Sequence, residues 1–231
     1  MVLEDWQQLN AELIKCVRCP RLVAWREQVA EEKRRAYLDW DYWGKPVPGF
    51  GDLQGEILVI GLAPGAHGSN RTGRMFTGDG SGDFLYPALN KAGFANQPES
   101  TSRDDGLELR NVYITSLCRC VPPANKPTSK EIENCLPFLL RERALLPELK
   151  VIVALGRVAF ERILRLHRKD GHDIPSHKFA HATKYELPGE LPWLVASYHP
   201  SRQNTQTGLL TSEMFAEIWQ SANSLSSENR G

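Results

Sequence analysis

Four short apolar segments alternate along the chain with stretches of helical periodicity. Each segment is almost continuously apolar, which is typical of parallel strands that are covered on both faces. They span residues 56–61, 112–116, 151–155 and 193–197. The order of strand, helix and strand predicts an α/β fold in which a four-stranded parallel sheet carries helices on both sides.

Apolar residues recur at helical spacing before, between and after these strands. The first 36 residues show it at Leu9, Leu13 and Ile14, and the charged run 31–35 is typical of a solvated helix face. Residues 222–231 are rich in Ser, Asn and Glu, so we expect a frayed polar tail after one domain spanning 1–221. Further helices are expected at about 83–92, 129–146, 157–165 and 207–219.

The charge balance narrows the classes of function. The 231 residues include 28 Lys and Arg against 28 Asp and Glu, which excludes a uniformly basic surface for nucleic acid and an acidic tail. Any contact with nucleic acid must therefore come from a local patch. No apolar run approaches the ~18 residues of a membrane span, and the N-terminus lacks a secretory signal. We therefore expect a cytoplasmic protein without a membrane segment.

Five cysteines suggest a metal site, because disulfides are rare in a reducing compartment. Cys16 and Cys19 form a CxxC pair, and Cys120 and Cys135 lie far away in the sequence, as in the second half of a split site. Four thiolates could therefore converge. Spacing alone does not distinguish a zinc site from an iron–sulfur cluster.

Two unusual segments directly follow predicted strands, where parallel sheets bind their ligands. Residues 61–74 are rich in glycine, which lets the backbone approach a ligand closely, and contain Arg71 and Arg74, which suit phosphate groups. A nucleotide cofactor site and a tight structural turn are the alternatives, although neither the dinucleotide fingerprint nor the P-loop pattern is present. Residues 198–204 form the second segment, Tyr-His-Pro-Ser-Arg-Gln-Asn.

These segments carry a resemblance to a known family. The stretch 61–82, which includes Arg-Thr-Gly-Arg-Met-Phe-Thr-Gly-Asp at 71–79, resembles the first motif of the uracil-DNA glycosylase superfamily in its family 5 form. The loop 120–128 and the segment 199–208, which starts His-Pro-Ser-Arg-Gln-Asn, are similar to the same family. The resemblance runs from about residue 16 to 211 and implies a single α/β/α domain that removes uracil from DNA without cutting the strand.

The resemblance also implies how the base is held. A base inside a duplex must be flipped into a pocket, stacked on an aromatic ring and recognised at its polar edge. Phe76 occupies the position that stacks on uracil in this superfamily, although a core Phe is the alternative. The resemblance assigns five further residues to substrate binding, namely Gly61, Ala63, His67, Asn70 and Ser116.

Three residues are the candidates for catalysis. His199 stands where the superfamily places a histidine that hydrogen-bonds uracil O2 and stabilises the leaving anion. Relatives often carry Asp or Asn at the position of Ala63, so we assign the carboxylate that positions water or offsets oxocarbenium charge to Asp79. An N-cap or turn is the alternative for Asp79. Asn125 is a candidate to contact the base or hold the water, with an ordinary loop asparagine as the alternative.

Two further departures from the family affect recognition. Ser116 replaces the base-reading Asn of many relatives, which leaves room for other deaminated bases such as hypoxanthine. Arg202 and Gln203 follow the His-Pro-Ser motif where relatives often insert an apolar wedge, so the sequence does not identify the wedge residue. Arg71, Arg74, Lys126 and Arg202 lie in loops expected to face DNA phosphates, with ordinary surface charges as the alternative.

The resemblance implies a [4Fe-4S] cluster on Cys16, Cys19, Cys120 and Cys135, held by thiolates in a structural role. Cys118 is left over and is expected to be a small buried side chain. His177 and His181 have i, i+4 spacing but lie in a polar stretch, where a solvated loop is favoured over zinc binding.

The sequence therefore predicts a monomeric DNA glycosylase of base-excision repair whose partner is DNA containing uracil or other deaminated bases. Two other classes stay open. One is a non-catalytic iron–sulfur or zinc module that binds nucleic acid, for which Ala63 and the cysteines argue. The other is a hydrolase of free nucleosides or nucleotides, which would not need cations in several loops.

Overall fold

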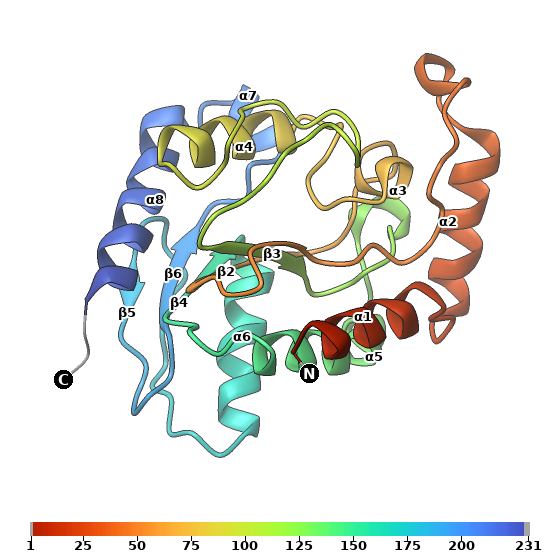
Figure 1. The fold of residues 1–231 in the computed structure, drawn as a ribbon. Helices are drawn as coiled ribbons and strands as arrows, with labels where there is room; N and C mark the ends of the chain where they lie inside the picture. The colour runs from red at the N-terminus through yellow and green to blue at the C-terminus, as the bar shows by residue number, and fades with distance from the viewer. Residues whose placement is uncertain (1, 229–231) are drawn as a thin grey trace.

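A computed structural model describes residues 2–228, which form a mixed sheet between two layers of helices (Figure 1). The four central strands are β2 (Ile57–Gly61), β3 (Val112–Ser116), β4 (Val151–Leu155) and β6 (Trp193–Ser197). They are parallel and run in the order β3-β2-β4-β6, with Ile57 opposite both Val112 and Val151. The predicted parallel sheet is confirmed.

Two edge strands were not predicted from the sequence. β1 (Phe50–Gly51) pairs antiparallel with β3, and β5 (Lys184–Tyr185) pairs antiparallel with β6. Each has only two residues, which is too short for a hydrophobic pattern to develop. They close the two edges of the parallel sheet and so limit pairing with another chain.

Helices cover both faces of the sheet (Figure 1). On one face lie α4 (Gly82–Lys91) and α8 (Ser212–Ser227), and on the other lie α1 (Val2–Ile14), α5 (Ser129–Ala144) and α6 (Arg157–Lys169). A further long helix, α2 (Pro20–Glu32), stands at the end of the molecule beyond β3. The short elements are α3 (Ser69–Thr72), α7 (Arg202–Gln206) and the 3-10 turns η1 (Arg35–Tyr37) and η2 (Pro123–Asn125).

Alternation along each strand divides the core into two clusters. Ile57 and Val59 of β2 pack with α4 and α8, whereas Leu58 and Ile60 pack with α1, α5 and α6. Every residue of β2 is buried, because both faces are covered. The nearly continuous apolar segments of the sequence have this physical origin.

The expected polar tail from residue 222 is wrong over 222–227. These residues continue α8, and Ala222, Leu225 and Ser226 are buried against the rest of the domain. Apolar side chains at helical spacing hold this last turn despite its polar composition. Residues 229–231 lie outside the described residues. Within residues 2–228, no helix is long and apolar enough to cross a bilayer.

Candidate active site

A cleft of about 790 Å³ opens at the carboxyl ends of β2, β3 and β6. This volume lies within the range of small-molecule sites. The cleft brings together residues from five segments that are distant in the sequence. Ten of the site residues predicted from the sequence line it, namely Gly61, Ala63, His67, Phe76, Asp79, Ser116, Asn125, Lys126, His199 and Arg202.

Phe76 lines the cleft and is held in a restrained position. Its backbone has a φ of 52°, which is unusual for an aromatic residue, and the preceding carbonyl of Met75 accepts a 2.7 Å hydrogen bond from the Tyr86 hydroxyl. Its ring packs on Gly61, where a Cβ would come within 2.9 Å of Phe76 Cζ. The ring is therefore both part of the core and part of the cleft wall, so the two interpretations of Phe76 are compatible.

His199 follows β6 and faces Phe76. The two ring centroids are 5.9 Å apart with an interplanar angle of 31°. The His199 carbonyl accepts a 2.8 Å hydrogen bond from Asn204 Nδ2, which ties the His-Pro-Ser turn to α7. Burial lowers the pKa of His199 to about 4, so the imidazole is neutral at physiological pH and one ring nitrogen carries a proton that can be donated.

Asp79 combines a structural and a cleft-facing position. Its Oδ1 accepts hydrogen bonds from the backbone N–H groups of Ser81 at 3.0 Å and Gly82 at 3.3 Å, so it caps the start of α4. Its Oδ2 packs against Gly65 and Gly68 of the glycine-rich loop. Burial raises the pKa of Asp79, and the two backbone donors and Arg202 partly offset this effect.

The opposite rim of the cleft is the loop that contains η2. Ala124 and Asn125 both have positive φ values, 51° and 56°, and both are exposed. The Lys126 carbonyl accepts a 3.1 Å hydrogen bond from Arg21 Nη2 of α2, which anchors the loop. The side chains of Asn125 and Lys126 thus stand at the mouth of the cleft, where they can meet a ligand that enters.

Two smaller polar groups complete the wall. His67 Nδ1 lies 3.1 Å from the Tyr42 hydroxyl, and burial together with Arg34 and Arg71 lowers the pKa of His67. Ser116 Oγ donates to the Cys118 carbonyl at 2.6 Å. Its proton is thereby committed to the protein, so toward a ligand Ser116 is an acceptor rather than a donor.

Three predicted site residues lie in the interior instead. Asn70 is fully buried and donates from Nδ2 to the Arg26 carbonyl at 3.2 Å. The Arg71 guanidinium lies 4.0 Å from the ring centroids of both Tyr37 and Trp40 and donates to the carbonyls of His67 and Gly78. These side chains hold the loop from inside and do not line the cleft, so their positions do not support the predicted contacts of Asn70 with the base and of Arg71 with phosphates.

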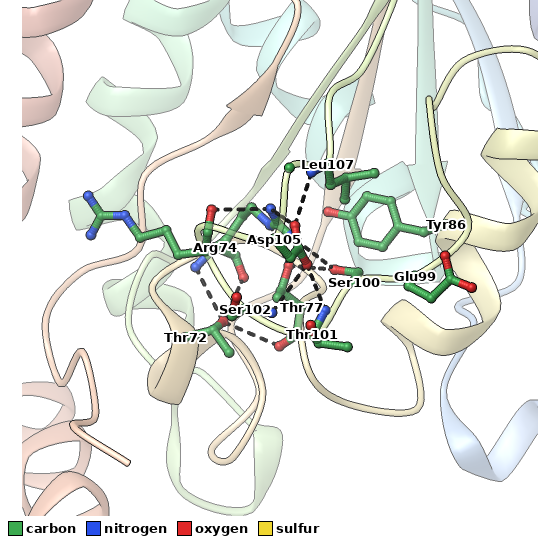
Figure 2. Close-up of polar contacts among 12 residues, drawn as sticks. Thr72, Arg74, Thr77, Tyr86, Glu99, Ser100, Thr101, Ser102, Asp105 and Leu107 are labelled. Atoms are coloured by element: carbon green, nitrogen blue, oxygen red, sulfur yellow. Dashed lines mark hydrogen bonds and ion pairs between the residues drawn. The ribbon is translucent and has the colours of Figure 1, made fainter.

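Arg74 is also an internal residue, and Figure 2 shows its polar contacts with Asp105 and Thr77. Its side chain is 4% exposed and makes a two-pronged ion pair with Asp105, with N–O distances of 2.8 and 2.7 Å. Its Nε donates to Thr77 Oγ1 at 2.9 Å. A guanidinium with these partners has no free face for DNA, so the position of Arg74 does not support the predicted phosphate contact.

The cysteines gather between α2, the 116–120 segment and α5. Cys19 and Cys120 belong to one small buried cluster, and both interact electrostatically with Cys16 and Cys135. In the described residues no set of three or more His, Cys, Asp or Glu side chains is arranged to bind a metal. Cys118 is buried, as expected for a small leftover side chain, and it hydrogen-bonds to Cys135.

One wall of the cleft was not predicted from the sequence. Arg34 and Tyr37, from the turn after α2, line it beside His67. Arg34 lies in a charged run that is typical of a solvated helix face and Tyr37 follows it, so nothing in the local pattern indicates that this turn folds over the glycine-rich loop. The available signal was the pair of aromatic residues Tyr37 and Trp40, because aromatic rings stack on cations such as Arg71 in the glycine-rich loop.

Comparison with known proteins shows the family to which the chain belongs. The uracil DNA glycosylase superfamily matches residues 48–223, and the chain belongs to this superfamily. A type-5 uracil-DNA glycosylase of Thermus thermophilus is 54% identical over 221 residues, which cover 96% of this chain and 98% of the relative. One from Mycobacterium bovis is 48% identical and covers 94% of this chain and 81% of the relative. The wild-type SMUG2 structure of Pedobacter heparinus has a TM-score of 0.48 and 17% identity, and covers 74% of this chain and 75% of that one.

Proposed function

We propose that the protein hydrolyses the N-glycosidic bond of uracil in DNA and leaves an abasic site, which starts base-excision repair. The observation that carries this proposal is the placement of Phe76, His199 and Asp79 in one cleft. An aromatic face, a neutral N–H donor and a carboxylate are what the reaction requires. The type-5 relatives, which match nearly the whole chain, support the same activity.

The chemistry separates charge between the base and the sugar. Breaking the bond leaves negative charge on the uracil and positive, oxocarbenium-like charge on the sugar. The neutral imidazole of His199 donates its proton as a hydrogen bond to uracil O2, and this bond strengthens as the anion forms. Phe76, next to His199, supplies the surface on which the base stacks.

Asp79 acts on the sugar side. Its Oδ1 is held by the cap of α4, which leaves Oδ2 as the oxygen that offsets the oxocarbenium charge or orients the attacking water. Ala63 has no polar group for this task, so the carboxylate reaches the cleft from the start of α4 instead of from β2. Asn125, exposed at the mouth, contacts the base or holds the water.

The cleft is suited to a flipped nucleotide. Lys126 and Arg202 are exposed at its rim and contact the phosphates of the strand that carries the flipped nucleotide. Arg202 packs against Gly80, next to Asp79, which places its charge close to the reacting sugar. Because every wall comes from a single chain, we propose a monomeric enzyme.

Substrate range follows from Ser116. A serine whose proton is donated to the Cys118 carbonyl offers one acceptor and leaves more space than the larger amide of asparagine. We therefore propose that other deaminated bases, such as hypoxanthine, are also substrates. A single acceptor on Ser116 restricts the bound base less than the donor and acceptor of an asparagine amide would.

The four cysteines fit a [4Fe-4S] cluster in the chemistry of their surroundings. Arg26 Nη1 donates to Cys120 Sγ at 3.1 Å, and Asn134 Nδ2 donates to Cys19 Sγ at 3.4 Å. Burial raises the pKa of Cys19 and Cys120, and these N–H donors partly offset that effect in favour of the thiolates that such clusters require. We propose that Cys16, Cys19, Cys120 and Cys135 hold the cluster, which would join α2 and α5 and supply structural stability, because hydrolysis needs no electron transfer.

The test is release of uracil from a duplex oligonucleotide with one central uracil, with alkali to reveal abasic sites. Wild-type protein should cleave, and His199→Ala should lose excision far more than DNA binding. Asn204→Ala, which removes the hydrogen bond to the His199 carbonyl but keeps the imidazole, is the matched control and should lose much less. Binding without any excision by the wild type would favour the non-catalytic module, and competition by free nucleosides but not by duplex DNA would favour a nucleoside hydrolase.

A further inference from the structure

The turn after α2 carries an exposed apolar side chain at the edge of the cleft. Leu38 is 56% exposed, whereas Tyr37 and Arg34, which precede it, line the cleft. In Figure 1 this turn projects beyond the body of the domain on the side of α3. An isolated exposed leucine needs no explanation by itself, but this one directly follows a residue that lines the cleft.

The turn is held by several contacts, although more than half of the Leu38 surface is exposed. Tyr37 and Trp40, on either side of Leu38, both contact the Arg71 guanidinium at 4.0 Å from their ring centroids. Lys33 Nζ donates to the Leu38 carbonyl at 3.1 Å, and the backbone N–H of Trp40 donates to the Tyr37 carbonyl at 3.2 Å. The backbone of Leu38 is therefore fixed to the glycine-rich loop through Arg71, while its side chain is free to contact another molecule.

We propose that Leu38 is the apolar wedge that enters the base stack of duplex DNA and fills the space left by the flipped nucleotide. Proteins that kink or unstack DNA insert side chains of this type. This inference rests on the proposed function and adds the residue that opens the duplex.

The charges around the cleft suit DNA as the occupant. Arg34, Lys126 and Arg202 line its walls from three separate segments, and Asp79 is the single acidic residue among the described residues that line it. Asp39 and Asp41 are exposed on the turn itself. We therefore expect the duplex to be guided by the three cations of the rim, and not by the net charge of the turn.

Leu209 is the main alternative wedge, since it is 48% exposed and follows α7. It lies six residues beyond Gln203, the last residue that lines the cleft, and follows Gly208, whose φ is 72°. No aromatic or cationic contact comparable to that of Arg71 fixes this segment among the described residues. Leu38 is thus the better-positioned side chain, and Leu209 serves as the matched control.

The experiment compares Leu38→Ala, Leu38→Met and Leu209→Ala with the wild type on uracil in duplex and in single-stranded DNA, under single-turnover conditions. A single strand has no stack to open, so it does not require a wedge. Leu38→Ala should lose at least about tenfold in rate on the duplex and less than about twofold on the single strand. Leu38→Met should recover most of the duplex rate, and Leu209→Ala should resemble the wild type.

A second readout keeps the two proposals separate. Fluorescence of 2-aminopurine beside the uracil reports unstacking and requires no bond cleavage. Wild-type protein should raise this fluorescence and Leu38→Ala should not, whether or not uracil is released. If the wild type raises the fluorescence but releases no uracil, the glycosylase proposal fails and the wedge proposal stands. Equal losses on duplex and single strand, a normal duplex rate with Leu38→Ala, or a duplex defect confined to Leu209→Ala would each overturn the role of Leu38.

Discussion

The carboxylate of Asp79 lies directly against Gly68, so closely that a Cβ on Gly68 would come within 1.9 Å of Asp79 Oδ2. The other oxygen, Oδ1, is held by two backbone N–H groups at the start of α4. Asp79 is therefore fixed on both sides, by the helix that it caps and by the loop that follows β2. A reacting carboxylate positioned in this way needs little reorganisation during the reaction.

The first prediction concerns Gly68. In Gly68→Ala the new methyl group must displace Asp79 Oδ2, and misplacement of a catalytic group by about 1 Å costs on the order of 100-fold in rate. Single-turnover excision should fall by this amount, while affinity for uracil-containing DNA stays nearly unchanged. Gly65→Ala, whose Cβ would come within 2.6 Å of the same oxygen, should show a smaller loss. Normal turnover by Gly68→Ala would mean that the position of Asp79 is unimportant.

The second prediction removes the charge of Asp79 and keeps its cap. In Asp79→Asn the amide oxygen can still accept from Ser81 and Gly82, so the melting temperature should change little. The rate should fall by about 10²–10⁴, the typical contribution of a positioned acid or base. Because burial raises the pKa of Asp79 above its ordinary 3.8, the wild-type rate should decline with falling pH at a higher pH than an ordinary aspartate would cause. An unchanged acid limb in Asp79→Asn would assign that titration to another group.

The third prediction concerns the protonation state of His199. With a pKa of about 4, His199 is neutral from pH 5.5 upward and should cause no inflection in the rate near pH 6.5. His199→Ala should lower the rate by about 10²–10³, as the loss of one donor to a developing anion typically does. His199→Gln, whose amide can still donate, should recover part of that loss. An inflection near pH 6.5 that disappears in His199→Ala would show that the cation is the active form.

Much of this fold and part of this site follow from the sequence for identifiable reasons. Strands buried on both faces leave long apolar segments, so their bounds are nearly as predicted, whereas two-residue edge strands leave no pattern. His199 and Phe76 were predicted as site residues because their motifs resemble those of the family, and the structure places both in the cleft. The buried partners of Arg71 and Arg74 could not be predicted in this way. A cation in a glycine-rich loop fits phosphate or a buried partner equally well, and its partners, Trp40 and Asp105, lie some 30 residues away in the chain.

The fourth prediction separates the proposed cluster ligands from their neighbour. Cys120→Ala should lose the broad visible absorbance and the iron content of the purified protein, and much of its thermal stability. Cys118→Ala is the matched control, because Cys118 is buried beside Cys135 but is not a proposed ligand. It should keep both iron and colour. Wild-type protein that contains zinc and no colour would replace the iron–sulfur assignment by a four-cysteine zinc site.

The last prediction tests the internal role of Arg74 through its partner. Burial opposes ionisation of Asp105, but the hydrogen bonds from Arg74 and from three backbone N–H groups prevail and lower the pKa of Asp105 to about 2. In Asp105→Asn the Arg74 guanidinium would remain buried without its counter-charge, so the free energy of unfolding at pH 7 should fall by about 3 kcal/mol or more. The exposed neighbour Asp104 gives the control, and Asp104→Asn should change this free energy by less than about 0.5 kcal/mol.

The pH dependence of this loss has a definite sign. The folded-state pKa of Asp105 lies below its ordinary value of 3.8, so the folded protein binds fewer protons than the unfolded chain between these two values. The stabilisation is complete above about pH 4 and disappears as the pH falls toward 2. Urea unfolding of wild type and Asp105→Asn should thus give a difference that is constant from pH 5 to 8 and shrinks in acid. A constant difference down to pH 2 would mean that Arg74 is not stabilised by the charge of Asp105, and would reopen a role for Arg74 outside the core.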